Sequence, residues 1–244
     1  MFDTEDLIES IFDNIQQMSI DDLSKRVIVA PTNAETLEMN RKIISLIPGD
    51  SEIYYSADSA VTDDPNDTLN FPVEFLNEQT PYGMPPHVLL LKNGVIIMLL
   101  RNLNPEKGLC NGTRLIIEGL ARNFIKARII SESNRGDLVF IPRIDLAPTD
   151  TTLPFILRRR QFPIIPAYAI TINKSQGQTF DYVGIHLPTP VFSHGQLYVA
   201  LSRSRNQHNV KVRIQPNPLG LQGALLNDGR QFTRNVVFHE VFQL

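Results

Sequence analysis

Hydrophobic positions near the start of the chain alternate between helix-like and strand-like patterns. Apolar residues at helical spacing within 5–24 predict a surface helix. Arg26–Ala30 is a continuous run rich in β-branched residues, which is typical of a buried parallel strand. Thr32 or Asn33 can then cap a helix over about 34–47. This strand–loop–helix unit places polar capping groups at the carboxyl end of the strand.

The middle of the chain carries shorter apolar runs separated by turn residues. Two runs, 87–91 and 95–100, flank an Asn-Gly pair and predict a hairpin with a type I′ turn. Further short strands are expected near 124–130 and 137–142. Closely spaced short strands with turn signals favour a small antiparallel barrel.

Strand and helix patterns alternate again after residue 155. Strands are expected at 163–169, 182–187 and 210–214, with a helix over 195–203. The predicted fold class is α/β, with a parallel, doubly wound sheet interrupted by a β-barrel insertion. The predicted boundaries are an amino-terminal helical segment at 1–25, the α/β domain at 26–80 and 155–244, and the insertion at 81–154.

Composition limits the ligands and the cellular environment expected for this chain. The 244 residues include 23 basic and 26 acidic side chains, for a net charge of −3, so any DNA binding must come from a local groove. A single cysteine cannot form an internal disulfide, and the histidine spacing suits no metal site. The longest apolar stretch, 95–100, is too short to cross a bilayer. We expect a soluble intracellular protein with no membrane partner and no metal of its own.

Candidate chemistry begins in the segment 166–180, PAYAITINKSQGQTF, where a strand ends on a polar cluster. Ligands of open α/β sheets collect beyond the carboxyl ends of strands, and hydroxyls, amides and a cation suit phosphate oxygens. The residues concerned are Thr171, Asn173, Lys174, Ser175, Gln176 and Gly177. A polar helix cap is the simpler alternative and is favoured by the pattern alone.

The segment 194–205, HGQLYVALSRSR, predicts a helix that packs on the sheet and ends near Arg203. An arginine held by a rigid element can stabilise the charge on a transferring γ-phosphoryl group. Arginine is also a common partner of the helix dipole at a carboxyl terminus. Spacing alone leaves both interpretations open.

These motifs, in this order, closely resemble the carboxy-terminal half of Pif-type (petite integration frequency) DNA helicases of superfamily one, especially those carried by Helitron transposons. The resemblance runs from about Val27 to the end of the chain. Further landmarks are APTNAETLEMN (30–40), YYSADS (54–59), QFPI (161–164), FSHGQLYVALSR (192–203) and NVVFHEVF (235–242).

The resemblance implies a second RecA-like domain with a small SH3-like β-barrel insertion, in a motor that moves 5′ to 3′ on single-stranded DNA with ATP and Mg²⁺. A first RecA-like domain would hold most of the nucleotide and the metal. By matching position, the DNA contacts would be Thr171, Asn173 and Lys174, the nucleotide contacts Gln176 and Gly177, and the arginine finger Arg203. Thr32 and Asn33 are further candidate DNA contacts.

The chain also departs from the family pattern. Many relatives carry histidine at the position of Asn173, and other superfamily-one helicases carry a phosphate-facing arginine at the position of Pro31. The basic run 158–160 could line a DNA path, although a solvated charge run is the default interpretation. Tyr82, Phe192 and Tyr198 are candidates for base stacking, but helical spacing favours a core position for Tyr198.

The sequence contains neither a phosphate loop of the form G-x-x-x-x-G-K-[ST] nor an Asp-Glu pair. The isolated chain is therefore expected not to hydrolyse ATP at a useful rate. Two functions stay open: part of an ATP-dependent DNA helicase whose first domain comes in cis or in trans, and a non-catalytic remnant that binds single-stranded DNA or a partner. The family resemblance allows transposition, DNA repair, recombination or telomere maintenance, in the nucleus or in mitochondria.

Overall fold

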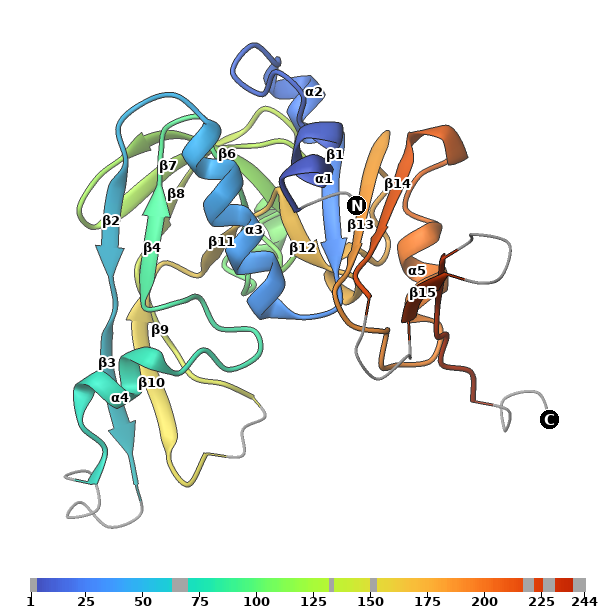
Figure 1. Ribbon diagram of the computed structural model, residues 1–244. Helices are drawn as coiled ribbons and strands as arrows, with labels where there is room; N and C mark the ends of the chain where they lie inside the picture. The colour runs from blue at the N-terminus through green and yellow to red at the C-terminus, as the bar shows by residue number, and fades with distance from the viewer. Residues whose placement is uncertain are drawn as a thin grey trace. The chain divides into compact units, whose positions relative to one another are not determined.

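The computed structural model of the chain describes residues 4–62, 70–131, 134–149, 153–216, 222–225 and 231–238 (Figure 1). The chain divides into two compact units. The first comprises Met1–Ile47 and Tyr168–Leu244, and the second, β-rich unit is Pro48–Ala167. This grouping counts residues 48–80 and 155–167 with the β-rich unit, whereas the boundaries expected from sequence place them in the α/β domain.

A four-stranded parallel sheet forms the centre of the first unit. Its order is β12-β1-β13-β14, with bounds Ala169–Thr171, Arg26–Ala30, Tyr182–Leu187 and Val210–Ile214. The strands β12, β1 and β13 are buried along nearly their whole length, as expected for a parallel sheet covered by helices. The predicted strands at 26–30, 182–187 and 210–214 are confirmed.

Helices α1 (Thr4–Ile11) and α3 (Asn33–Leu46) pack on this sheet (Figure 1). The β13 residue Gly184 leaves room for α1, since a Cβ there would meet Ile11 at 3.0 Å. A helix is confirmed within residues 5–24, but it does not continue through the whole range. The chain instead forms α1 and the short α2 (Ile20–Ser24), because Asn14 takes a left-handed conformation (φ 53°) and Ser19 caps a new helix.

The β-rich unit contains a five-stranded antiparallel sheet of order β11-β5-β6-β7-β8. The bounds are Ile164–Pro166, Ile96–Leu99, Arg114–Leu120, Phe124–Ile129 and Leu138–Pro142. The predicted strands near 124–130 and 137–142 are confirmed as β7 and β8. Among the described residues no ladder joins β8 to β11, so the pairings form an open sheet and leave the SH3-like barrel unconfirmed.

Two local predictions in this part of the chain are wrong. The expected hairpin does not form, because β4 (Val88–Leu91) pairs with β2 (Glu52–Tyr55) while β5 pairs with β6 and β11. An Asn-Gly turn permits a reversal but does not choose the partner of a strand. The single strand expected at 163–169 is divided between β11 and β12, at the point where the chain passes from one unit to the other.

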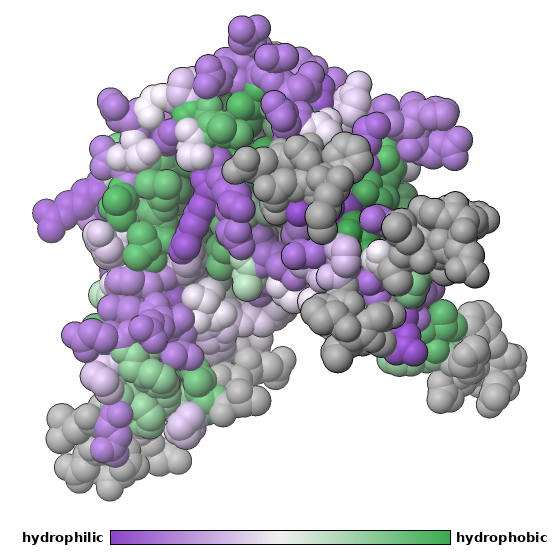
Figure 2. Space-filling model, in the orientation of Figure 1, coloured by the Kyte–Doolittle hydropathy of each residue, from purple (hydrophilic) through white to green (hydrophobic). Residues whose placement is uncertain are grey.

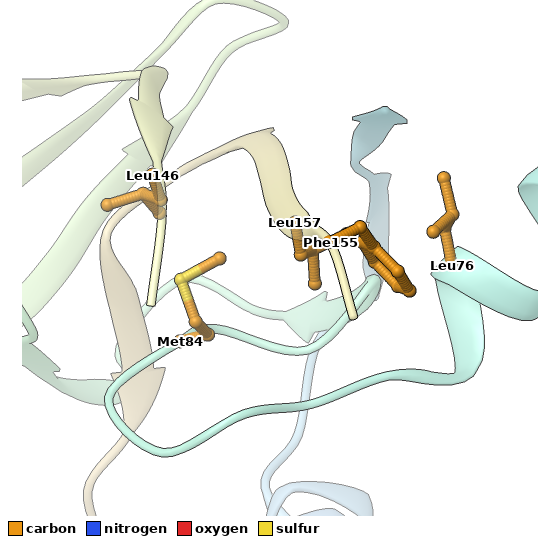
Figure 3. Close-up of a cluster of buried hydrophobic side chains, with 5 residues drawn as sticks. All are labelled: Leu76, Met84, Leu146, Phe155 and Leu157. Atoms are coloured by element: carbon orange, nitrogen blue, oxygen red, sulfur yellow. The ribbon is translucent and has the colours of Figure 1, made fainter. Parts of the chain in front are cut away.

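A second sheet of the β-rich unit has the order β3-β10-β9, with bounds Ala57–Val61, Ile156–Gln161 and Ile144–Leu146. Its apolar cluster includes Leu157 of β10 and Leu76 of α4 (Val73–Glu78) (Figure 3). Hydrophobic surface also gathers around α4, β3 and β10 (Figure 2). No helix in the described ranges is both long and apolar enough to span a membrane.

The basic run 158–160 lies on β10, where side chains alternate between the two faces of the sheet. Arg158 and Arg160 are exposed, but Arg159 is fully buried, so the solvated charge run is wrong for the central residue. Arg159 forms a bidentate ion pair with Asp58, with Nη2 2.6 Å and Nε 2.9 Å from the carboxylate oxygens. This arginine is paired inside the unit and is not exposed to line a path for DNA.

Candidate functional site

The carboxyl edge of the parallel sheet brings together the polar segment that begins at Thr32 and the polar segment that follows Thr171. In the ladder between β1 and β12, Ala30 lies opposite Thr171, and the Ile172 amide donates to the Ala30 carbonyl at 3.0 Å. Parallel neighbours end at the same edge, so the segment that begins at Thr32 and the segment that follows Thr171 leave the sheet side by side. The structure therefore supplies the proximity that the sequence could only suggest.

Residues 173–178, which we call the ledge, follow β12 directly. They begin with a short 3₁₀-helix, η3 (Asn173–Ser175), and the Ser175 hydroxyl donates to the Ile172 carbonyl at 2.6 Å. Asn173, Gln176 and Gly177 are exposed, whereas Ser175 is fully buried. Gly177 has φ +79° with no atom within 4 Å of a Cβ at that position, so its backbone is open to a ligand.

Two of the predicted DNA contacts serve as local caps. Thr171 is 5% exposed, and its hydroxyl accepts the Lys174 amide at 3.4 Å. The Thr32 hydroxyl accepts the Glu35 amide at 3.5 Å, and the Glu35 carboxylate accepts the Thr32 amide at 3.0 Å, which completes a capping box. Both threonines order the edge, while Asn173 and the half-buried Lys174 present side chains at its surface.

Arg203 follows α5 (Gln196–Leu201) and is half-buried against the ledge. Its Nη1 donates to the carbonyls of Ser175 at 3.0 Å and Gln178 at 2.8 Å, on either side of Gln176 and Gly177. Its Nε donates to the Val199 carbonyl in α5 at 2.7 Å, so the helix-terminal role is also filled. One side chain thus connects α5 to the ledge.

Most N–H donors of the Arg203 guanidinium already have acceptors within the chain. Its fourth bond runs from Nη2 to the Ser202 hydroxyl at 2.8 Å. A guanidinium has five N–H donors, so these four bonds leave one Nη2 hydrogen without an acceptor among the described residues. That hydrogen is the group through which Arg203 can contact an external oxygen in this conformation.

Sequence reasoning missed Asn40 on α3, which fixes the strand that leads into the ledge. Its amide nitrogen donates to the Ala169 carbonyl at 2.6 Å, and its oxygen accepts the amides of Tyr168 at 3.1 Å and Ala169 at 2.9 Å. Asn40 is 2% exposed, and its side chain makes these three hydrogen bonds to the backbone of β12 and the residue before it. The available signal was an asparagine in helical phase with the core residues of α3, at i+4 from Thr36 and i−3 from Ile43.

Large apolar side chains are exposed on α5 and in the segment just before it. Phe192 is 61% exposed, Tyr198 74% and Leu201 48%. The core position predicted for Tyr198 is therefore wrong. Helix α5 has only six residues and buries the face of Gln196 and Ala200, which leaves Tyr198 on the outer face.

His186 of β13 is a buried titratable group of this unit. Its pKa is lowered to about 4, chiefly by burial and then by the charge of Arg213, while Glu38 opposes the shift and Lys42 reinforces it. Its Nδ1 is buried and has no hydrogen-bond partner among the described residues. His186 is therefore neutral at physiological pH.

Models of known protein families match part of each unit. Residues 74–120 match the 2B domain of the DNA helicase Pif1, and residues 166–210 match the carboxy-terminal domain of UvrD-like helicases. The chain is 34% identical over 176 residues to the ATP-dependent DNA helicase PIF1 of Rattus norvegicus, covering 71% of this chain and 25% of that relative. It is 29% identical over 230 residues to the ATP-dependent DNA helicase Pif1 of Bdellovibrio bacteriovorus, covering 94% and 48%.

The fold is similar to that of Bacteroides Pif1 in a crystal structure bound to single-stranded DNA. The TM-score is 0.56 at 25% sequence identity, with 97% of this chain and 57% of that chain covered. The fold is thus mixed α/β, with a parallel sheet that resembles a RecA-like helicase domain. The chain spans between a quarter and about half the length of the two curated relatives described above.

Proposed function

We propose that this chain, which corresponds to the carboxy-terminal half of a Pif1-type DNA helicase, supplies the second motor domain of an ATP-dependent, 5′-to-3′ DNA helicase. In this proposal the β-rich unit is the 2B-type, SH3-like insertion of that domain. One observation carries the proposal: Arg203 is bonded to both ends of the exposed Gln176–Gly177 segment at the carboxyl edge of the parallel sheet. The guanidinium of Arg203 therefore lies next to the exposed backbone of Gln176 and Gly177.

Single-stranded DNA is the proposed ligand of Asn173 and Lys174, the first two residues of the ledge. Asn173 and Lys174 present an amide and an ammonium group there, and Asn33 begins α3 at the same sheet edge. Such groups contact phosphate and sugar oxygens and position a strand without reading its sequence. Thr171 and Thr32 support this contact through the caps that order the two segments.

Nucleotide phosphates are the proposed ligand of Gln176, Gly177 and Arg203. A first RecA-like domain, in cis or in trans, would hold most of the ATP and its Mg²⁺, and Arg203 would stabilise the charge that develops on the γ-phosphoryl group. The exposed side chains of Phe192, Tyr198 and Leu201, on α5 and in the segment before it, offer that domain an apolar contact surface. ATP turnover then belongs to the assembled motor and not to this chain alone.

The finger assignment is tested in a motor completed with the phosphate-loop domain of a Pif1-type relative. Arg203→Ala should lower kcat for DNA-stimulated ATP hydrolysis by about 10³-fold or more, and Arg203→Lys should not restore it, because the planar guanidinium is lost. The exposed neighbour Arg205→Ala is the matched control and should stay within about twofold of the parent. Undiminished kcat in Arg203→Ala would remove the finger from the proposal.

The DNA contact is tested on the 244-residue chain itself by fluorescence anisotropy with a dT oligonucleotide between about 50 and 200 mM NaCl. Lys174→Ala should weaken binding and reduce the slope of log Kd against log salt by about one. Lys211→Ala, an exposed lysine on β14 of the same unit, is the control and should leave the slope unchanged. Identical slopes for the parent and Lys174→Ala would exclude a phosphate contact by this lysine.

A further inference from the structure

The outer face of β7 and β8 in the β-rich unit has an unusual composition. Side chains alternate along both strands, and one set, which includes Ile125, Ile129 and Ile141, is fully buried. The opposite set faces outward and would ordinarily be polar in an antiparallel sheet. Here it consists of Phe124, Lys126 and Arg128 on β7 and Leu138, Phe140 and Pro142 on β8.

The aromatic and basic side chains of this face are interleaved. In the ladder, Lys126 lies opposite Phe140 and Arg128 opposite Leu138. The rings of Phe124 and Phe140 lie on the diagonal, with centroids 5.5 Å apart in an edge-to-face arrangement. The two phenylalanines are 44% and 58% exposed, so each keeps ring surface open to a flat ligand.

The charges on this face are available to an anion. Arg128 and Lys126 pair with Glu118 of β6 at 2.5 Å and 3.6 Å, and Arg128 Nη1 also donates to the Gly136 carbonyl at 2.7 Å, which leaves its Nη2 for an anion. The three side chains are partly exposed, and such ion pairs contribute little stability. Residues 118–143 contain five basic and three acidic residues, which is a local excess of two positive charges in a chain of net charge −3. A phosphate can therefore replace Glu118 as the partner of either cation.

We propose that the outer face of β7 and β8 is a further binding surface for single-stranded DNA, on which bases stack on Phe124 and Phe140 while phosphates contact Lys126 and Arg128. Stacking platforms interleaved with cations are the general means by which proteins bind single strands without sequence preference. A second copy of this chain fits less well, because a two-fold contact would set the same cations against each other. This surface shares no residue with the ledge, so it stands independently of the proposed function.

The test uses matched pairs of substitutions in the full chain, with Lys174→Ala as the background so that ledge binding is reduced. Phe124→Leu with Phe140→Leu keeps apolar bulk but removes the rings, whereas Phe124→Tyr with Phe140→Tyr keeps them. The leucine pair should weaken binding of a dT oligonucleotide of about 15 nucleotides by about tenfold, and the tyrosine pair should stay within about twofold. Lys126→Gln with Arg128→Gln should reduce the salt slope by about two.

Several outcomes would overturn this surface. Equal affinities of the leucine and tyrosine pairs, or tighter binding of an rU oligonucleotide than of dT, would remove the assignment to single-stranded DNA. A parent that sediments as a dimer and becomes a monomer with the leucine pair would assign the face to a second copy. The two sites fail separately: if Lys174→Ala weakens binding but the leucine pair does not, only the ledge binds DNA, and the reverse result retains only this face.

Discussion

The two units differ in whether the polar side chains that they bury carry a charge. The β-rich unit buries a charged pair, Arg159 and Asp58, both with fully buried side chains. The parallel-sheet unit instead buries neutral groups, Asn40 and His186, and keeps the guanidinium of Arg203 half-exposed at the edge of its sheet. A fully buried charge interacts only with groups of its own chain, whereas a charge at the edge of a sheet can still bind a ligand.

The hydrogen bonds explain why the buried pair is tolerated. Besides Asp58, Arg159 donates to the carbonyls of Pro85 at 2.9 Å and Leu76 at 3.1 Å, and Asp58 accepts the Ser56 hydroxyl at 2.7 Å. Desolvation of two charges is repaid only when the remaining donors and acceptors are also satisfied. Arg203 resembles Arg159 in its several carbonyl partners, but no carboxylate in the described part of the chain pairs with it.

Breaking the buried pair should give the largest effect. Arg159→Met leaves Asp58 buried without its cation and should lower the free energy of unfolding by about 3–5 kcal/mol. Urea denaturation followed by circular dichroism measures this. Arg160→Met removes an exposed arginine of the same strand and should change stability by about 0.5 kcal/mol or less. Similar losses in both variants would contradict the special cost of the buried charge.

Removal of Asn40 should have the next largest effect. Asn40→Ala leaves the Tyr168 and Ala169 amides and the Ala169 carbonyl without their side-chain partner and should cost about 2–3 kcal/mol. The loss should also weaken binding of single-stranded DNA, because β12 leads into the ledge. Ser45→Ala is the control on an exposed part of α3. An Asn40→Ala variant as stable as Ser45→Ala would show that β12 is held by other contacts.

His186 should make the parallel-sheet unit sensitive to acid. Its pKa is about 4 in the folded chain and about 6.5 when unfolded, so the unfolded state binds the proton first as pH falls. The corresponding stability is complete above pH 6.5 and is lost as pH falls to 4 and below, by about 3 kcal/mol. His186→Gln should remove this part of the pH dependence in urea denaturation, whereas the exposed His208→Gln should retain it. Parallel pH profiles for the parent and His186→Gln would contradict this origin.

Local order in the chain was largely readable from its sequence. The β-branched run 26–30, the capping signal before α3 and the strands at 182–187 and 210–214 follow from nearest-neighbour chemistry, and the structure confirms them. The polar cluster after β12 and the arginine after α5 were also recognisable, because their residue types suit phosphate oxygens. Each of these features depends on fewer than about 20 consecutive residues.

Pairing and burial were decided by the tertiary structure. The Asn-Gly turn after β4 could not reveal that β4 pairs with β2, and three adjacent arginines could not reveal that the middle one meets Asp58, 101 residues away in the chain. The link from Arg203 to the ledge likewise joins carbonyls 25 and 28 residues distant. Backbone carbonyls are identical in every residue, so only the folded chain selects which of them an arginine reaches.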